Sequence, residues 1–221
     1  MDQPDLDDEL HEEALIGLRR INRISGSSGM VWPAIERLAK QSAGTPIRVL
    51  DVGCGGGDVA INLHSRAAAR GVALEVAGCD ISSTALKFAT KQANEKGQNI
   101  HFFEANAIVD SLPVDYDVVM CSLFLHHLDR RDAIRLLISM AKATRRIVLV
   151  NDLQRSRFGY VMAYVGCRLL TRSPVVRTDG PLSVRAAFSL KEVTVMAEEA
   201  GMPDARFSQH WPQRFLLSWE R

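Results

Sequence analysis

The spacing of hydrophobic and polar residues predicts an alternation of strands and helices from residue 47 onwards. Short apolar runs are separated there by segments in which apolar residues recur at helical spacing. The predicted strands are 48–52, 74–79, 100–104, 116–121 and 146–150, and the predicted helices between them are 59–70, 84–96 and 131–143. Strands that alternate with helices in this way form a parallel sheet covered on both faces.

The two ends of the chain depart from this alternation. Apolar spacing predicts one helix at 6–24 and another at 31–39, which together give an N-terminal helical cap over residues 1–44. Near the C-terminus, a helix at 190–200 precedes "ARFSQHW" and "RFLLSWE", which flank a short turn like the strands of a hairpin. We therefore expect residues 45–221 to form a Rossmann-like, doubly wound α/β domain. Its seven-stranded, mostly parallel sheet would end in a C-terminal antiparallel β-hairpin.

The segment at about 153–188 has no place in the alternation and is interpreted as an insertion after the fifth strand. Its first half, 158–170, is mostly apolar at helical spacing. Between Arg155 and Arg185 there are six arginines against one acid, Asp179. This composition fits a packing helix with solvated ends, a lid over an acceptor pocket, or a surface in transient contact with a membrane.

Composition and charge narrow the class of protein. The 221-residue chain has a formal net charge of +1, which does not favour a dedicated nucleic-acid binder. Its four cysteines are widely spaced, with no Cys-x-x-Cys pair, as is typical of free thiols in a reducing compartment. The acidic start lacks a signal-peptide pattern, and no run of about 18 apolar residues is present. A cytoplasmic protein is expected.

The stretch "IRVLDVGCGGGDVAINL" predicts a strand, a glycine-rich turn and a helix that together bind a nucleotide-like ligand. A phosphate-binding loop would need Lys and then Ser or Thr after Gly57, but Asp58 and Val59 follow. Asp58 also occupies the third glycine position of the dinucleotide fingerprint. An acid at this helix start would repel a pyrophosphate, so a ligand with a positive centre is favoured.

Polar side chains follow three successive strands where an open α/β sheet binds its ligands. Asp51 precedes the glycine turn, where a carboxylate can meet an ammonium group. Asp80 ends the second strand and can accept hydrogen bonds from two ribose hydroxyls, and the amide of Asn106 can meet an adenine edge. The structural alternatives are a solvated acid, a helix N-cap and a turn asparagine, respectively.

The motifs "VLDVGCGGGD", "GCDIS", "EANAI" and "DVVMCSLFLHHL" resemble those of class I S-adenosylmethionine-dependent methyltransferases. The His-His-Leu after the fourth strand resembles the small-molecule branch that includes quinone-biosynthesis enzymes. Many members carry Asp where Asn106 stands. The resemblance implies S-adenosylmethionine as cofactor, with contacts from Asp51, Gly53, Cys54, Gly55, Gly57, Asp80, Ile81, Asn106, Ala107 and Ser122.

Two adjacent histidines are the candidate catalytic residues. His127 is the first candidate and His126 the second. Both follow the fourth strand and can act as general base toward a hydroxyl acceptor. In the alternative interpretation, one of them packs against or caps the helix that begins near Asp129. Asn151 and Asp152 offer oxygen ligands for a metal, but "CSLF" at the matching end of strand four provides no acid, so no metal is expected.

The expected activity is methyl transfer from S-adenosylmethionine to a small phenolic, quinone-like or lipid-like acceptor, at oxygen or carbon. Two alternatives remain from the sequence. One is a nicotinamide-dependent oxidoreductase on a similar sheet, and the other is a non-catalytic protein that binds S-adenosylmethionine. The acceptor, the choice between O- and C-transfer, and the oligomeric state are not specified by these patterns.

Overall fold

The structure is a computed structural model that describes residues 26–42, 44–170 and 174–221. The helix expected at 6–24 lies outside the described residues. The chain forms, in order, α2 (Ser27–Gln41), β1 (Ile47–Val52), α3 (Asp58–Ala69), β2 (Leu74–Asp80), α4 (Ser83–Glu95), β3 (His101–Glu104), β4 (Tyr116–Ser122), η1 (Leu125–His127), α5 (Arg130–Ala143), β5 (Thr144–Leu153), α6 (Arg157–Leu170), α7 (Pro174–Ala186), α8 (Leu190–Glu199), β6 (Arg206–His210) and β7 (Arg214–Glu220).

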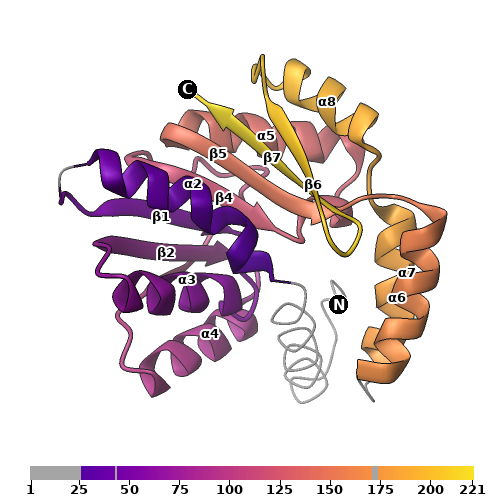
Figure 1. The fold of residues 1–221 in the computed structure, drawn as a ribbon, viewed down its shortest axis with the longest axis horizontal. Helices are drawn as coiled ribbons and strands as arrows, with labels where there is room; N and C mark the ends of the chain where they lie inside the picture. The colour runs from indigo at the N-terminus through magenta and orange to yellow at the C-terminus, as the bar shows by residue number, and fades with distance from the viewer. Residues whose placement is uncertain (1–25, 43, 171–173) are drawn as a thin grey trace.

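The strands form one seven-stranded sheet in the order β3-β2-β1-β4-β5-β7-β6 (Figure 1). The first five strands pair in parallel, and β7 runs antiparallel to both β5 and β6. The expected doubly wound sheet with a C-terminal antiparallel hairpin is therefore confirmed. The order reverses between β1 and β4, and open α/β sheets bind their ligands at such a reversal.

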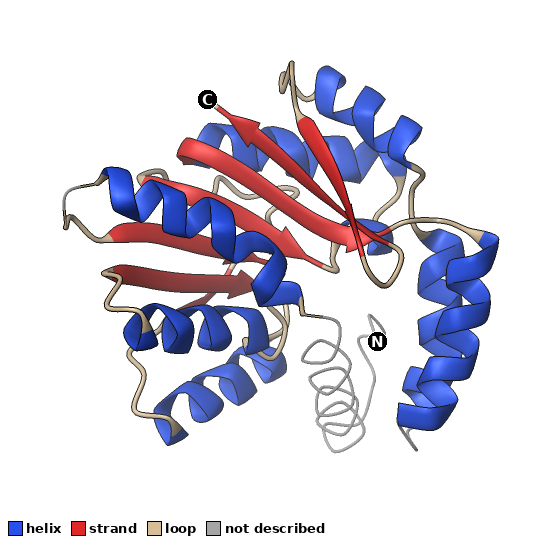
Figure 2. Ribbon diagram, in the orientation of Figure 1, coloured by secondary structure: helices blue, strands red, loops and turns tan. Residues whose placement is uncertain are grey.

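Helices cover both faces of the sheet (Figure 2). Apolar residues of α2 and α3 pack with those of β1, β4 and β5 in one core, and α3 and α4 share a smaller core with β2. The opposite face packs against α5 and α8. Helix α2 is longer than the predicted 31–39, and its Trp32 is buried in the core beneath Arg66 and Arg70 of the α3 region.

The insertion forms two helices, α6 and α7, which pack together beyond the carboxyl ends of the parallel strands (Figure 1). The sequence predicted the first helix but not the second, because Gly180 and Pro181 normally interrupt a helix. Close packing explains the difference: Gly180 lies so near Cys167 of α6 that any side chain there would collide with its sulfur. Helix α7 also contacts η1, the turn that carries both histidines.

Strand β5 is longer than the predicted 146–150, and this changes the setting of two residues. Asn151 and Asp152 lie within the strand rather than after it, because β7 pairs with β5 as far as Leu153. Both residues are buried. Their side chains alternate across the sheet, so Asn151 faces α2 and α3 while Asp152 faces the side of η1 and α5.

Candidate functional site

The glycine-rich turn after β1 combines close packing with one open position. Gly53, Gly55 and Gly57 all have positive φ (65°, 50° and 74°), a conformation that other residues rarely adopt. A side chain at Gly53 would lie 2.6 Å from the Phe124 ring, so this glycine also serves packing. At Gly55, by contrast, no described atom lies within 4 Å of an added Cβ. The turn is thus open to a ligand at Gly55.

Asp51 is a buried carboxylate with an unused acceptor atom. It is 1% exposed, and its Oδ1 has no hydrogen-bond partner within the described part of the chain. Burial raises the pKa of Asp51 well above its ordinary value, and the nearby carboxylates of Asp58 and Asp80 raise it further. A cationic group placed here would satisfy the oxygen and stabilise its charge.

Asp80 orders the glycine turn and the start of α4 through its two carboxylate oxygens. Its Oδ2 accepts a hydrogen bond from the Gly55 N–H at 2.8 Å, and its Oδ1 accepts one from the Ser82 N–H at 2.9 Å. Ser82, not Asp80, provides the N-cap of α4, since its hydroxyl accepts from the Ala85 N–H. The next residue, Ile81, exposes 65% of its surface beside this carboxylate.

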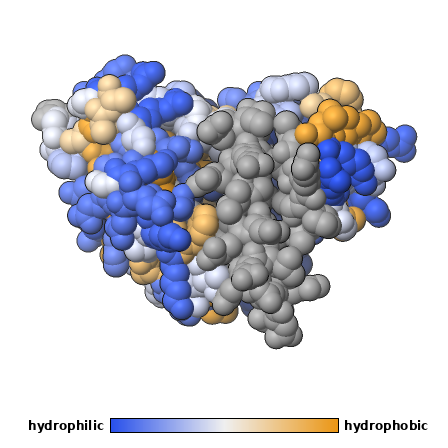
Figure 3. Space-filling view, turned by 90° about the horizontal axis from the view of Figure 1, so that it is seen from below, coloured by the Kyte–Doolittle hydropathy of each residue, from blue (hydrophilic) through white to orange (hydrophobic). Residues whose placement is uncertain are grey.

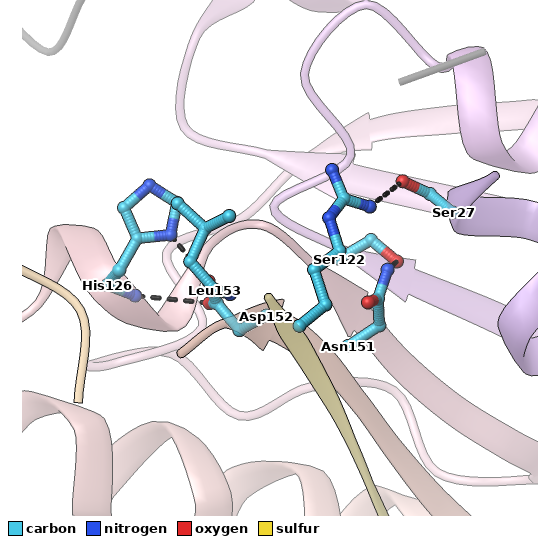
Figure 4. Close-up of polar contacts among 7 residues, drawn as sticks. Ser27, Ser122, His126, Asn151, Asp152 and Leu153 are labelled. Atoms are coloured by element: carbon cyan, nitrogen blue, oxygen red, sulfur yellow. Dashed lines mark hydrogen bonds and ion pairs between the residues drawn. The ribbon is translucent and has the colours of Figure 1, made fainter. Parts of the chain in front are cut away.

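The remaining predicted cofactor residues have mixed settings. The side-chain oxygen of Asn106 accepts a hydrogen bond from the Ile108 N–H at 3.1 Å, and Ala107 is buried. These contacts are those of a turn asparagine, although an amide oxygen can accept a second bond. Cys54 is buried, and its N–H donates to the Cys79 carbonyl at 3.0 Å. Ser122 ends β4 and accepts a long 3.4 Å bond from the amide of Asn151 (Figure 4).

His126 forms a buried pair with Asp152 (Figure 4). The distance from His126 Nδ1 to Asp152 Oδ1 is 2.6 Å, and the His126 backbone N–H donates to Asp152 Oδ2 at 3.1 Å. Burial by itself raises the pKa of Asp152, but His126 and the Leu153 N–H outweigh it and lower that pKa below its usual range. The carboxylate is therefore ionised and can only accept, so Nδ1 carries the hydrogen.

The other histidines lie in different surroundings. His127 is exposed, and its ring lies 4.2 Å from that of His126, centroid to centroid. Asp129, not a histidine, caps α5 through the Asp132 N–H. His210 lies on β6 at 2.8 Å from the Ser208 hydroxyl. Among the described residues there is no cluster of three metal-ligating side chains, and Asp152 is engaged with His126.

The sequence did not identify two residues of this region. Asp152 was considered only as a metal ligand, and its pairing with His126 depends on the end of β5 lying beside η1. Arg214, the first residue of β7, is 2% exposed and donates from Nη1 to the Ser27 hydroxyl at 2.7 Å. The sequence feature that could have indicated the burial of Arg214 is a charged residue at an inward-facing position of a predicted strand.

Comparison with known sequences shows which protein family the chain resembles. Residues 49–146 match the model of a methyltransferase domain family. The ubiquinone biosynthesis O-methyltransferase of Thiobacillus denitrificans is 31% identical over 160 residues, 70% of this chain and 64% of the relative. The corresponding enzyme of Pseudomonas fluorescens is 30% identical over 128 residues, 57% of this chain and 52% of that protein. The chain thus spans less than two thirds of these relatives.

Solved structures share the fold at lower identity. Magnesium protoporphyrin IX methyltransferase from Synechocystis, solved with bound SAH, has a TM-score of 0.63 at 20% identity, covering 89% of this chain and 84% of that one. The mitomycin 7-O-methyltransferase MmcR has a TM-score of 0.63 at 18% identity, covering 80% and 50%. In sequence and fold the chain resembles the class I S-adenosylmethionine-dependent methyltransferases. The relatives that it matches at about 30% identity are enzymes of ubiquinone biosynthesis.

Proposed function

We propose that this protein transfers the methyl group of S-adenosylmethionine to a small-molecule acceptor. One arrangement supports the proposal: three features lie at the carboxyl ends of the adjacent strands β1, β4 and β5. They are the open glycine turn, the Asp51 Oδ1 that has no partner among the described residues, and the His126–Asp152 pair. Donor and acceptor would meet at these strand ends. The acceptor that fits best is a phenolic, quinone-like or lipid-like molecule that reacts at oxygen or carbon, because a base is available for its proton.

The cofactor, when bound, supplies a methyl group already activated on a sulfonium, so the protein mainly binds and orients. Asp80 would accept the ribose hydroxyls, and Ile81 offers its exposed apolar side chain to the adenine. Asp51 would meet the ammonium of the methionine part, and Gly55 allows the backbone to approach. The unused Asp51 oxygen and the space at Gly55 are the observations that fit this cofactor. Holding donor and acceptor in line contributes up to ~7–11 kcal/mol in well-oriented reactions.

His126, rather than His127, is the general base favoured by the geometry. Asp152 holds the Nδ1–H form of the ring, which leaves the Nε2 lone pair free to accept a proton. The same hydrogen bond stabilises the imidazolium that forms when a phenol or an enolisable carbon loses its proton. General-base catalysis of this kind contributes about 10²–10⁴-fold to the rate. His127, by contrast, is exposed rather than buried beside a carboxylate at the end of β5.

The insertion at 153–188 would act as a lid over the acceptor, and residues 1–44 as a helical cap beside the domain at 45–221. Helix α7 contacts the histidine turn η1, which supports the first of these roles. The lid also presents a surface suited to transient contact with a membrane. Apolar residues are exposed along α6 and on α7, namely Phe158, Val161, Tyr164, Val165, Leu169 and Leu182, and Arg157 and Arg168 of α6 are also exposed. Figure 3 shows apolar and strongly hydrophilic side chains next to each other at the right of the molecule.

No helix among the described residues is both long and apolar enough to span a bilayer. In this proposal, the exposed apolar face of α6 contacts the lipid and the arginines attract anionic headgroups. Such a contact would bring the acceptor pocket to the place where lipid-like substrates dissolve. Anionic vesicles provide the direct test of this part of the proposal.

The alternative functions make different binding and turnover predictions. A nicotinamide-dependent oxidoreductase is not favoured, because Asp58 replaces the third fingerprint glycine and the family match is to methyltransferases. A non-catalytic protein would bind the cofactor without turnover. Calorimetry with S-adenosylmethionine, S-adenosylhomocysteine and NADH should show micromolar binding of the first two only. Incubation with labelled S-adenosylmethionine and a panel of phenols and quinols should then label a product. Binding without any labelled product would favour the non-catalytic alternative.

A further inference from the structure

Arg214 is a buried cation with a donor that no described residue accepts. Of its N–H groups, Nη1 donates to Ser27, whereas Nε has no partner in the part of the chain that the structure describes. Figure 4 shows Ser27 at the end of this contact. A buried guanidinium with an unused N–H donor lowers the folding stability unless an acceptor forms a hydrogen bond with that donor. Arg214 therefore has a buried donor suited to an anionic acceptor.

Three buried atoms that have no partner within the described ranges share one face of the sheet: Asp51 Oδ1, Asn151 Oδ1 and Arg214 Nε. Side chains two positions apart on a strand point to the same face. Two positions from each of these residues is an apolar side chain that packs into the core formed with α2 and α3. These apolar residues are Val49, Leu149 and Leu216. The unused donor and the unused acceptors therefore lie at the carboxyl ends of β1 and β5 and the adjoining start of β7, on the α2–α3 side.

Electrostatics connects Asp51 with Arg214 through Asp58, the first residue of α3. The carboxylate of Asp58 raises the pKa of Asp51, and it also favours the charged form of Arg214. Burial lowers the pKa of Arg214 to about 10, against the opposing effect of Asp152 and Asp58, so the guanidinium stays cationic at neutral pH. The Oδ1 of Asp51 and the Nε of Arg214, neither of which has a partner among the described residues, thus belong to side chains within electrostatic range of Asp58 at the start of α3. This setting is complementary to a zwitterion.

We propose that Arg214 binds the α-carboxylate of the methionine part of S-adenosylmethionine, opposite the ammonium that Asp51 accepts. The proposal rests on the proposed use of this cofactor. A carboxylate matches the planar guanidinium, which can donate two parallel hydrogen bonds to its oxygens. The pairing also explains why a charged residue begins β7 in a register that places it inside the protein.

Calorimetry with two ligands tests this role. S-adenosylhomocysteine carries the amino-acid part, whereas 5′-methylthioadenosine keeps the adenosine and the sulfur but lacks the carboxylate and ammonium. Arg214→Met should weaken S-adenosylhomocysteine binding about 10–100-fold, the range for hydrogen bonds to charged groups, and leave 5′-methylthioadenosine binding unchanged. Arg214→Lys should give an intermediate loss for the first ligand only. Arg206→Met, an exposed arginine of the same hairpin, is the matched control and should bind both ligands normally.

Ser27→Ala separates ligand binding from a purely structural role. It removes the hydrogen bond between the hairpin and α2 but keeps the guanidinium, so affinity for S-adenosylhomocysteine should be retained. The proposal is overturned if Arg214→Met retains that affinity, if Arg214→Met and Arg214→Lys lose both ligands alike, or if Ser27→Ala loses as much as Arg214→Met. Failure of the wild-type protein to bind S-adenosylhomocysteine would instead contradict the use of the cofactor itself.

Discussion

The imidazole of His126 is held by the carboxylate of Asp152, with 2.6 Å between Nδ1 and Oδ1 and both side chains buried. The two residues are 26 positions apart. His126 lies in η1, which follows β4, and Asp152 lies in the neighbouring strand β5. Asp152 also accepts the backbone N–H groups of His126 and Leu153. The ring is thus fixed in both position and tautomer, which is what a base needs before its substrate arrives.

Methyl transfer should depend on this pair and not on the adjacent histidine. His126→Asn should lower kcat by about 10²–10⁴-fold, because no group would then accept the acceptor's proton. Asp152→Asn should also lower kcat, since an amide can donate to Nδ1 and so favour the wrong tautomer. His127→Asn is the matched control and should keep most of the rate. Affinity for S-adenosylhomocysteine should be unchanged in all three, and equal rates for His126→Asn and wild type would remove His126 from the mechanism.

The loss of folding stability at acid pH should also depend on Asp152. Its pKa is lowered in the folded protein, so its contribution to stability is present above its unfolded value of about 3.9 and is lost as the pH falls through the folded value. Thermal melting of wild type and Asp152→Asn between pH 2 and pH 7 measures the difference. The gap between their midpoints should be widest near neutral pH and should close below about pH 4. A constant gap would show that pairing of the charged carboxylate is not the cause.

Cofactor affinity should decrease as the pH is lowered, because Asp51 takes up a proton. Burial and the carboxylates of Asp58 and Asp80 raise its pKa in the free protein, so it takes up a proton at a higher pH than an ordinary aspartate. A bound ammonium prefers the ionised form, and protonation therefore opposes binding. Titrations with S-adenosylhomocysteine should show weaker binding as the pH is lowered, and Asp51→Asn should bind weakly with a flatter pH dependence. An unchanged slope in Asp51→Asn would assign the effect to another group.

Much of the fold was predictable because its patterns are local. The sheet was predicted from three features: glycines after an apolar strand, hydrophobic spacing that alternates between strand and helix periods, and two strand-like runs flanking a short turn. Each feature depends on residues that are close together in the sequence. Helix α7 was not predictable, because its Gly180 and Pro181 oppose a helix locally, and the close packing of Gly180 against Cys167 of α6 cannot be read from the sequence. The extension of β5 similarly depends on pairing with β7, more than 60 residues later.

The candidate site shows the same division between local and long-range information. Asp51, Gly55 and Asp80 are recognisable from a motif and its spacing. The Asp152 partner of His126 and the burial of Arg214 arise only when strands that are distant in sequence are placed side by side. A titratable residue at the end of a strand can be found from the sequence, but its partner cannot.

Binding to anionic membranes should depend on the apolar face of α6. Val161→Glu would place a carboxylate among exposed apolar side chains and near arginines, opposing both insertion and headgroup attraction. Val195→Glu on α8 is the matched control, since Val195 is also an exposed valine on a helix. In sedimentation with phosphatidylglycerol vesicles, wild type and Val195→Glu should co-sediment and Val161→Glu should not. Equal sedimentation of the two variants would exclude this face of α6.

Gly55 and Gly97 offer a comparison that separates backbone strain from ligand contact. Both have positive φ (50° and 65°), and neither has a described atom within 4 Å of an added Cβ. Alanine at either position should therefore cost about 1–2 kcal/mol of folding free energy from the left-handed conformation alone. Gly97 follows α4, away from the strand ends, so Gly97→Ala should bind S-adenosylhomocysteine normally.

Gly55→Ala should lose that affinity, because its methyl group would fill the open side of the turn where the ligand approaches. Denaturant titration measures the first effect and calorimetry the second. Similar stabilities with different affinities would place the cofactor against Gly55. Similar affinities would leave the three glycines with a role in the turn alone, since strain would then be the whole effect of the substitution.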